Sequence, residues 1–157
     1  MRSSRTQRFL IIVILVFTCV FLGDVVSPIS SSAESIANKS ELGKKYTKRY
    51  NKLKKKCKKK FTYNAPQQEM NRQAHEEYLL WDDELNYVYK DIYKRLSTKE
   101  KNKLKKSEIK WIKKRDKKAE DEAAENLGGT IYPLIYNGSL TDSTKARIRW
   151  LIRTYTT

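Results

Sequence analysis

The sequence has few of the residues that build disulfides, metal sites or phosphate loops. Its 157 residues include two cysteines, one histidine, three prolines and five glycines. Cys19 lies in an N-terminal apolar segment that we expect to be removed, which leaves Cys57 without a partner for an internal disulfide. His75 has no second ligand type at metal-binding spacing, and there is no glycine-rich phosphate loop or nucleophile elbow. We therefore expect no metal and no cofactor.

The residue pairs of hydrolytic enzymes are also missing. Asp82, Asp83 and Glu84 are consecutive, so in a helix their carboxylates point in different directions and do not form a glycosidase pair. Cys57 lies beside six lysines, which favour its thiolate, and we interpret it as an incidental or intermolecularly oxidised thiol rather than a nucleophile. The sequence predicts no catalytic residue and a protein that is not an enzyme.

The N-terminal residues 1–33 have the pattern of a secretory signal peptide. Three arginines precede an apolar run over residues 9–22, which is short for a membrane span of about 20 residues. The small residues Ser31, Ser32 and Ala33 follow, and we expect cleavage after Ala33. The alternative is an uncleaved membrane anchor. Lipidation of Cys19 is rejected because the residues before it make a poor lipobox. The predicted location is therefore secreted or in the cell envelope.

Positive charge is concentrated just after this segment, in residues 34–60, which we call the lysine-rich arm. The chain carries a formal net charge of +16, of which the arm supplies +10 from twelve Lys or Arg and two Glu, while residues 61–157 carry +4. Such a run is expected to bind anionic polymers or membrane surfaces, and deletion of Lys44 to Lys60 is expected to abolish that binding and leave the bundle folded. The expected anion-binding residues are Lys44, Lys45, Lys48, Arg49, Lys52, Lys54, Lys55, Lys56, Lys58, Lys59 and Lys60.

The arm also has a periodic apolar pattern. Tyr46, Tyr50, Leu53, Cys57 and Phe61 recur at steps of three and four, so a helical arm would be amphipathic. Its lysine runs repel one another, which favours partial disorder when the arm is free in solution. Besides anion binding, the alternative interpretation is that the arm is a solvated segment with no fixed role.

Residues 66–116 predict two long helices joined by a tight turn near Leu96 and Ser97. Ser97 and Glu100 have the spacing of a capping box, and Gly128-Gly129 is expected to stop the second helix. Apolar residues at helical spacing mark the inner faces: Met70, Ala74, Trp81, Leu85, Val88, Ile92 and Leu96 in the first helix, and Leu104, Trp111, Ile112, Ala119 and Ala123 in the second.

Polar residues interrupt these apolar faces and need partners if they are buried. An antiparallel hairpin turning at residue 97 puts Arg115 level with Asp82, and Glu108 near Asn86. We therefore predict an Asp82–Arg115 ion pair with Asn86 and Glu108 hydrogen-bonded around it, as a structural network rather than a catalytic site. The predicted network residues are Asp82, Leu85, Asn86, Tyr89, Glu108, Trp111 and Arg115.

The C-terminal part predicts one further helix. Residues 130–140 are interpreted as an irregular crossing followed by a short helical turn, not as a strand, with a break at Asn137-Gly138 and a helix beginning near Thr141. That helix is expected to turn Ala146, Trp150, Leu151 and Tyr155 inward, with Arg147, Arg149 and Arg153 on its outer side. The predicted fold is all-α, a small bundle built on a long antiparallel hairpin with a C-terminal helix packed across it. The domains are residues 1–33, 34–60 and 61–157.

Motifs over residues 61–155 resemble a known family of small helical envelope and secreted domains. They are Gln68-Glu69-Met70-Asn71, Asp82-x-Glu84-Leu85-Asn86-x-x-Tyr89, Leu104-x-x-Ser107-x-x-x-Trp111-Ile112-x-x-x-Arg115-Asp116, Gly128-Gly129-Thr130-Ile131 and Thr144-x-x-Arg147. In this order they resemble the N-terminal domain of LprI-type lysozyme inhibitors. Gln73, Ala119 and Ser139 stand where such proteins usually carry cysteines, so the family's disulfides are not expected here.

Two functions follow, and they do not exclude each other. The resemblance implies a non-enzymatic protein that occludes a lysozyme or another envelope protein. The charge implies a protein that binds anionic polymers or membrane surfaces through the arm, and nucleic acid is not expected as a primary partner. Because the lysozymes that such a domain would block are typically basic, we expect weak or no inhibition by this basic chain. A local negative patch is expected to form, if at all, near the open end of the hairpin, from Glu76, Glu77, Asp83, Asp91, Glu120, Asp121, Glu122 and Glu125.

Overall fold

The computed structural model describes residues 32–156, with side-chain environments from Ala37 onward. Residues 1–31, which hold most of the predicted signal peptide, lie outside the described residues. The described elements are four α-helices and one 3-10 turn: α2 (Ser32–Lys60), α3 (Gln67–Arg95), α4 (Thr98–Ala123), η2 (Ala124–Asn126) and α5 (Tyr132–Tyr155). Within this range there is no strand, and the predicted all-α class is confirmed.

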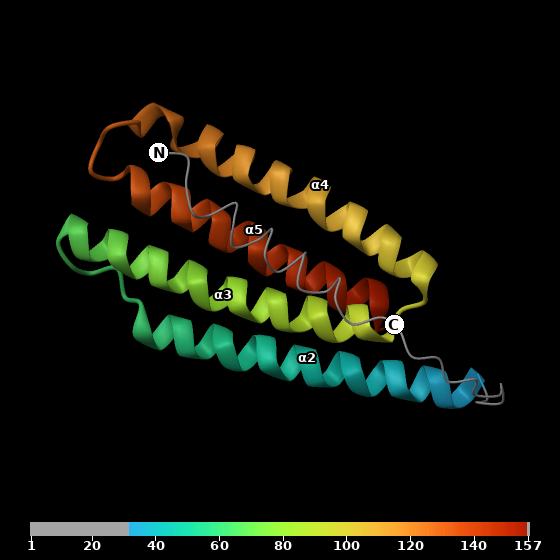
Figure 1. The fold of residues 1–157 in the computed structure, drawn as a ribbon. Coiled ribbons are helices and arrows are strands. Elements are labelled where there is room, and N and C mark those ends of the chain that lie inside the picture. The colour runs from blue at the N-terminus through green and yellow to red at the C-terminus, as the bar shows by residue number, and fades with distance from the viewer. Residues whose placement is uncertain (1–31, 157) are drawn as a thin grey trace. The chain divides into compact units, whose positions relative to one another are not determined.

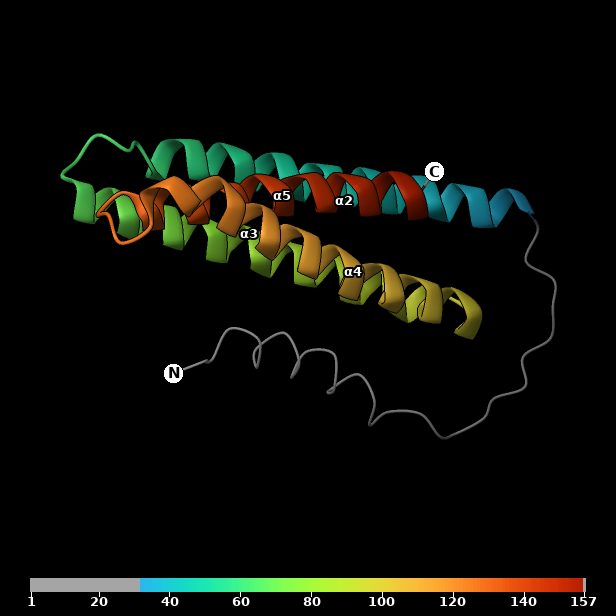
Figure 2. The ribbon, with the colours of Figure 1, turned by 90° about the horizontal axis from the view of Figure 1, so that it is seen from above.

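Successive helices run in opposite directions, so α2 is antiparallel to α3, α3 to α4 and α4 to α5 (Figure 1). α5 packs against both helices of the α3–α4 hairpin, as predicted, and runs parallel to α3. α2 packs against α3 and α5 (Figure 2). Because the most extensive helix contacts are those of α5 with α3 and α4, the hairpin is held together mainly through the C-terminal helix.

The turn between α3 and α4 is built as the sequence predicts. Ser97 is the N-cap of α4, and its Oγ accepts a hydrogen bond from the backbone N of Glu100 at 3.4 Å. The Glu100 Oε2 atom accepts in return from the backbone N of Ser97 at 3.0 Å. The predicted capping box is confirmed, and it fixes where the chain reverses direction.

The core contains the predicted inner face of α3, with Trp81 and Val88 fully buried, but it also contains part of α2. Tyr46 is 0% exposed and Cys57 is 3% exposed. Burying a large apolar side chain contributes about 1.5–3 kcal/mol. Residues 34–60, which the sequence pattern sets apart from the helical domain, therefore supply a helix whose aromatic stripe packs into the same core as α3 and α5.

The predicted break at Asn137-Gly138 was wrong, because α5 is continuous from Tyr132 to Tyr155. Pro133 lies in the first helical turn, where a missing backbone N–H costs nothing. Asn137 is buried, and its Nδ2 donates to the Pro133 carbonyl oxygen at 2.6 Å, which satisfies the amide inside the helix. The turn-forming residues are thus accommodated because the helix begins before them.

Candidate functional site

Asp82 on α3 and Arg115 on α4 lie across the hairpin, with Asp82 Oδ1 and Arg115 Nη1 3.5 Å apart. Asn86 Nδ2 donates to Asp82 Oδ2 at 3.1 Å. Arg115 also reaches Asp116 Oδ1, at 2.8 Å from Nε and 2.7 Å from Nη2. The Arg115 side chain is only 3% exposed, so these acids are the groups that compensate its buried charge.

Glu108 forms a second buried pair, with Arg147 of α5. Arg147 Nε and Nη2 donate to Glu108 Oε2 at 3.0 and 2.8 Å, and both side chains are 7% exposed. The expectation that Arg147 lies on the outer side of the last helix was therefore wrong. A buried carboxylate on α4 needs a cation, and α5 is the helix that packs against it. Ala146, expected to face inward, is exposed.

Aromatic rings connect these two pairs. The Trp111 ring centroid lies 5.1 Å from the Arg115 guanidinium carbon and 5.4 Å from that of Arg147. Trp111 is half-buried, whereas Trp81 is fully buried in the core. Of the other predicted network residues, Leu85 lies in the core, and Tyr89 is buried beside Tyr93 with ring centroids 5.7 Å apart.

Burial governs the ionisation of this network. It raises the pKa of Glu108, against the lowering effect of Arg147. It likewise raises the pKa of Asp82, against the lowering effect of Arg115. Each acid already faces a guanidinium and is largely closed to solvent. The arrangement is therefore better suited to holding α3, α4 and α5 together than to transferring a proton to a substrate.

Sequence reasoning missed a second polar centre, around Glu77 of α3. Glu77 was expected on the surface, but it is 9% exposed. Glu77 Oε1 accepts from Trp81 Nε1 at 3.1 Å and from Lys145 Nζ at 2.9 Å, while Oε2 accepts from the Tyr63 hydroxyl at 2.8 Å. Burial alone would raise the pKa of Glu77, but the bonds from Lys145 and Tyr63 lower it. The only indication of this centre in the sequence is the spacing of four residues between Glu77 and Trp81, which places them on the same face of a helix.

Cys57 does not have the activated thiol that its lysine neighbours suggest. The side chain points into the core, and burial raises the pKa of the thiol. The lysines beside it in sequence lie on other faces of α2 and are exposed. Lys56 and Lys60 do lower the pKa of the thiol, as expected, but burial and the nearby Glu77 outweigh them, so the expected net stabilisation of the thiolate was wrong.

Some of the basic residues of the predicted lysine-rich arm form ion pairs, and the others are exposed to solvent. Lys45 pairs with Asp91, Arg49 with Glu84 and Lys60 with Glu76, which fastens α2 to α3, and Lys44 pairs with Glu41 within α2. Lys54, Lys56 and Lys58 are exposed. Four further exposed lysines lie opposite the buried stripe and have no ion pair among the described residues. We call them the α2 lysine face: Lys48, Lys52, Lys55 and Lys59.

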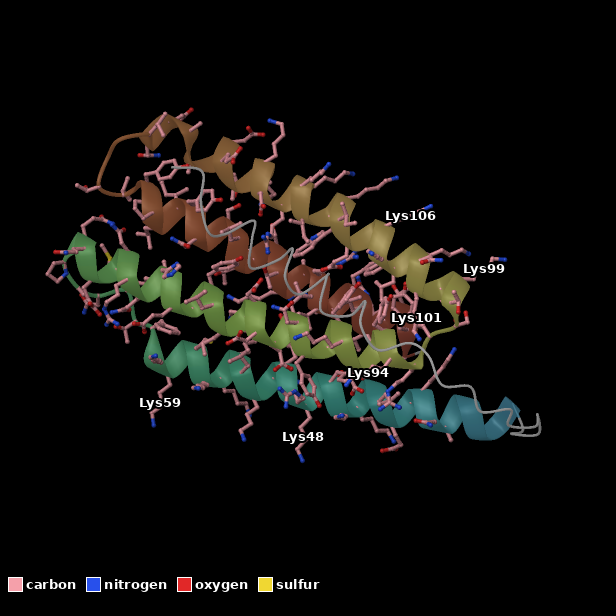
Figure 3. The ribbon with its side chains drawn as sticks, viewed as in Figure 1. Lys48, Lys59, Lys94, Lys99, Lys101 and Lys106 are labelled. Atoms are coloured by element: carbon pink, nitrogen blue, oxygen red, sulfur yellow. The ribbon has the colours of Figure 1, made fainter. Side chains whose placement is uncertain are left out.

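Figure 3 shows Lys48 and Lys59 pointing from α2 away from α3. Lys99 and Lys106 point outward from α4. Exposed lysines therefore lie on α2, α3 and α4, and the set on α2 is distinguished by its surroundings in the sequence. Residues 42–68 contain no acid at all.

Among residues 32–156, none of the helices combines the length and the apolar character needed to cross a membrane. The comparison with curated proteins and the comparison with solved structures each gave no match. A family model described as "Lysozyme inhibitor LprI" matches residues 57–151. This region runs from the end of α2 through most of α5 and includes both buried polar centres. The chain therefore belongs to the LprI lysozyme inhibitor family.

Proposed function

We propose that this protein is a non-catalytic binding protein of the cell envelope or the secreted fraction, attached to anionic polymers through the α2 lysine face. One observation carries the proposal: four exposed lysines without ion pairs among the described residues occupy the side of α2 opposite its buried stripe. A helix rises about 1.5 Å per residue, so the face spans roughly 16 Å. A phosphate-rich polymer or a layer of phospholipid head groups presents repeated negative charge over such a length.

The α2 lysine face can be tested without disturbing the core. We expect replacement of Lys48, Lys52, Lys55 and Lys59 by Gln to weaken binding to polyphosphate and to vesicles containing an anionic lipid. At about 1 kcal/mol per lysine near such a surface, the loss is on the order of 100- to 1,000-fold. Binding of the unchanged chain should weaken steeply between about 50 and 200 mM salt.

The matched control removes four exposed lysines from α4. Replacement of Lys99, Lys103, Lys106 and Lys110 by Gln changes the net charge by the same amount. An equal loss in both quadruple variants would mean that only total charge matters, and binding indifferent to salt would remove the proposed role of α2.

Inhibition of a lysozyme is the second candidate function, and the family match is the observation that favours it. The family name implies a protein partner. Against a basic lysozyme we expect weak inhibition, because like charge slows encounter and lowers affinity. Lysis of bacterial cell walls by a basic lysozyme, followed by turbidity with and without the protein, measures this. Tight stoichiometric inhibition at low salt would contradict the expectation.

Export is tested by the mass of the protein recovered from cells and from the medium. We expect a chain that begins at or near Glu34. A full-length chain in the membrane pellet after washing with high salt would instead indicate an uncleaved anchor.

A further inference from the structure

The connection between α4 and α5, residues 124–131, exposes apolar side chains to an unusual degree, and we call it the α4–α5 loop. Leu127 is 79% exposed and Ile131 is 38% exposed. The other large hydrophobic residues found exposed in the described part of the chain are Leu79 and Ile109, at 38% and 41%, and each stands alone on a helix. Leu127 therefore leaves more of its apolar surface in water than any of these.

Hydrogen bonds hold the α4–α5 loop in one shape. The backbone N of Leu127 donates to the Ala124 carbonyl oxygen at 3.1 Å, and that of Gly129 donates to Asn126 at 2.9 Å. Asn71 Nδ2 of α3 donates to the Thr130 carbonyl oxygen at 2.7 Å. Gly128 has a φ of 81°, in the left-handed region that favours glycine. A side chain held out on a fixed loop loses little further conformational entropy when it binds.

The charge around the loop has the opposite sign to that of the chain as a whole. Residues 119–144 contain five acids and no Lys or Arg, although the chain has a net charge of +16. Asp121 and Glu122 pair with Lys117 and Lys118. Glu120 and Glu125 are exposed and have no ion pair among the described residues. This end of the molecule would repel an anionic polymer and attract a basic surface.

We propose that the α4–α5 loop docks on a basic protein partner, with Leu127 entering an apolar recess and Glu120 and Glu125 meeting its positive rim. Apolar anchors that fill a recess supply much of the affinity of an interface, while rim charges mainly speed association. The inference deepens the second candidate function and rests on it, but it is independent of the α2 lysine face. It also identifies the part of a basic chain that can approach a basic partner.

The test measures binding of the full mature chain to a basic lysozyme at low salt by interferometry. We expect Leu127→Asp to weaken binding at least 10-fold, mainly through faster dissociation. The matched control is Ile109→Asp, an exposed apolar residue on α4, which should bind within about twofold of the unchanged chain. Replacing Glu120 and Glu125 together by Gln should slow association severalfold and make it less sensitive to salt.

Each result is informative. If the unchanged chain binds lysozyme and Leu127→Asp binds equally well, the loop proposal fails while the inhibitor function stands. If the unchanged chain does not bind, both fail. A Leu127-dependent dimer in sedimentation experiments would assign the loop to a second copy and would also overturn the proposal. Circular dichroism should show every variant folded, and polyphosphate binding through α2 should not change.

Discussion

The side chains of Glu108 and Arg147 are each 7% exposed. If one of them is removed, water cannot reach the remaining side chain to solvate its charge. Removing one member of a buried ion pair typically costs about 3–5 kcal/mol, because the remaining charge is left uncompensated. Arg115 is buried to a similar extent but has two acids near it, Asp82 and Asp116. Loss of one partner should therefore destabilise the protein more at Arg147, which pairs with Glu108, than at Arg115, which has two acids beside it.

Double-mutant cycles test this difference. Arg147→Gln should destabilise the protein by about 3–5 kcal/mol, and Glu108→Gln by less, because burial already raises the pKa of Glu108; together they should cost less than the sum. For Asp82→Ala and Arg115→Ala we expect smaller coupling, since Asp82 and Arg115 are 3.5 Å apart and Asp116 shares the guanidinium. The free energy of unfolding in urea gives both values. Additive effects in the Glu108–Arg147 cycle would show that the contact contributes nothing.

Glu77 and Glu108 should give opposite dependences on pH. The pKa of Glu77 is lowered by folding, so its contribution is present above the ordinary glutamate value of 4.5 and is lost as pH falls through the lowered pKa. The pKa of Glu108 is raised, so its contribution is fully present below 4.5 and is lost as pH rises through the raised pKa. The penalty of Glu77→Gln should shrink toward acid, and that of Glu108→Gln toward neutral pH.

Urea unfolding between about pH 3 and 8 measures both penalties. Glu125→Gln, at an exposed acid without an ion pair among the described residues, is the control and should behave as the unchanged chain does at every pH. If both penalties changed with pH in the same direction, the opposite pKa shifts of Glu77 and Glu108 would be contradicted.

At the scale of elements, α5 carries a glycine in its interior that the fold does not require. A Cβ built at Gly138 meets no atom within 4 Å, so Gly138→Ala should stabilise the protein by about 0.5–1 kcal/mol through lower backbone entropy of the unfolded chain. Gly43 in α2 is the matched contrast, because a Cβ there would lie 2.7 Å from Thr156 Oγ1. Thermal unfolding should show a higher midpoint for Gly138→Ala and no such gain for Gly43→Ala.

α2 should be required for folding, which reverses the expectation from the sequence that residues 44–60 can be deleted and leave the bundle folded. Tyr46 is fully buried, its hydroxyl donates to Asp91 Oδ2 at 2.9 Å, and burial raises its pKa to about 12. We expect deletion of residues 44–60 to expose the core, with loss of cooperative unfolding and gain of binding to an apolar dye. A deletion variant that unfolds cooperatively, with unchanged stability, would show that α2 packs only loosely.

At the scale of the whole molecule, charge is divided between two regions. The lysine-rich arm, which forms most of α2, carries +10, and residues 119–144 carry five acids without a base. Removing four positive charges from the α2 lysine face should therefore improve association with a basic lysozyme at low salt, while it weakens polyphosphate binding. Association rates measured at two salt concentrations decide this. Parallel loss of both activities would mean that one surface serves both.

The sequence alone determined the helical class, the α3–α4 turn with its capping box and most of the inner face of α3. These features depend on local spacing and capping chemistry, which are legible within a few residues. The family motifs extend over residues far apart in the sequence and identified the family, and the match to residues 57–151 confirms that identification.

Only the tertiary structure decided which charges are buried and what each of them contacts. Arg147, Glu77 and Lys145 look like ordinary surface residues in sequence, yet their environments are set by helices that pack against them from distant parts of the chain. It also decided that Asn137-Gly138 lies inside a helix and that α2 belongs to the core. Burial depends on how the helices pack together, because the residues that shield a side chain from water come from other segments of the chain.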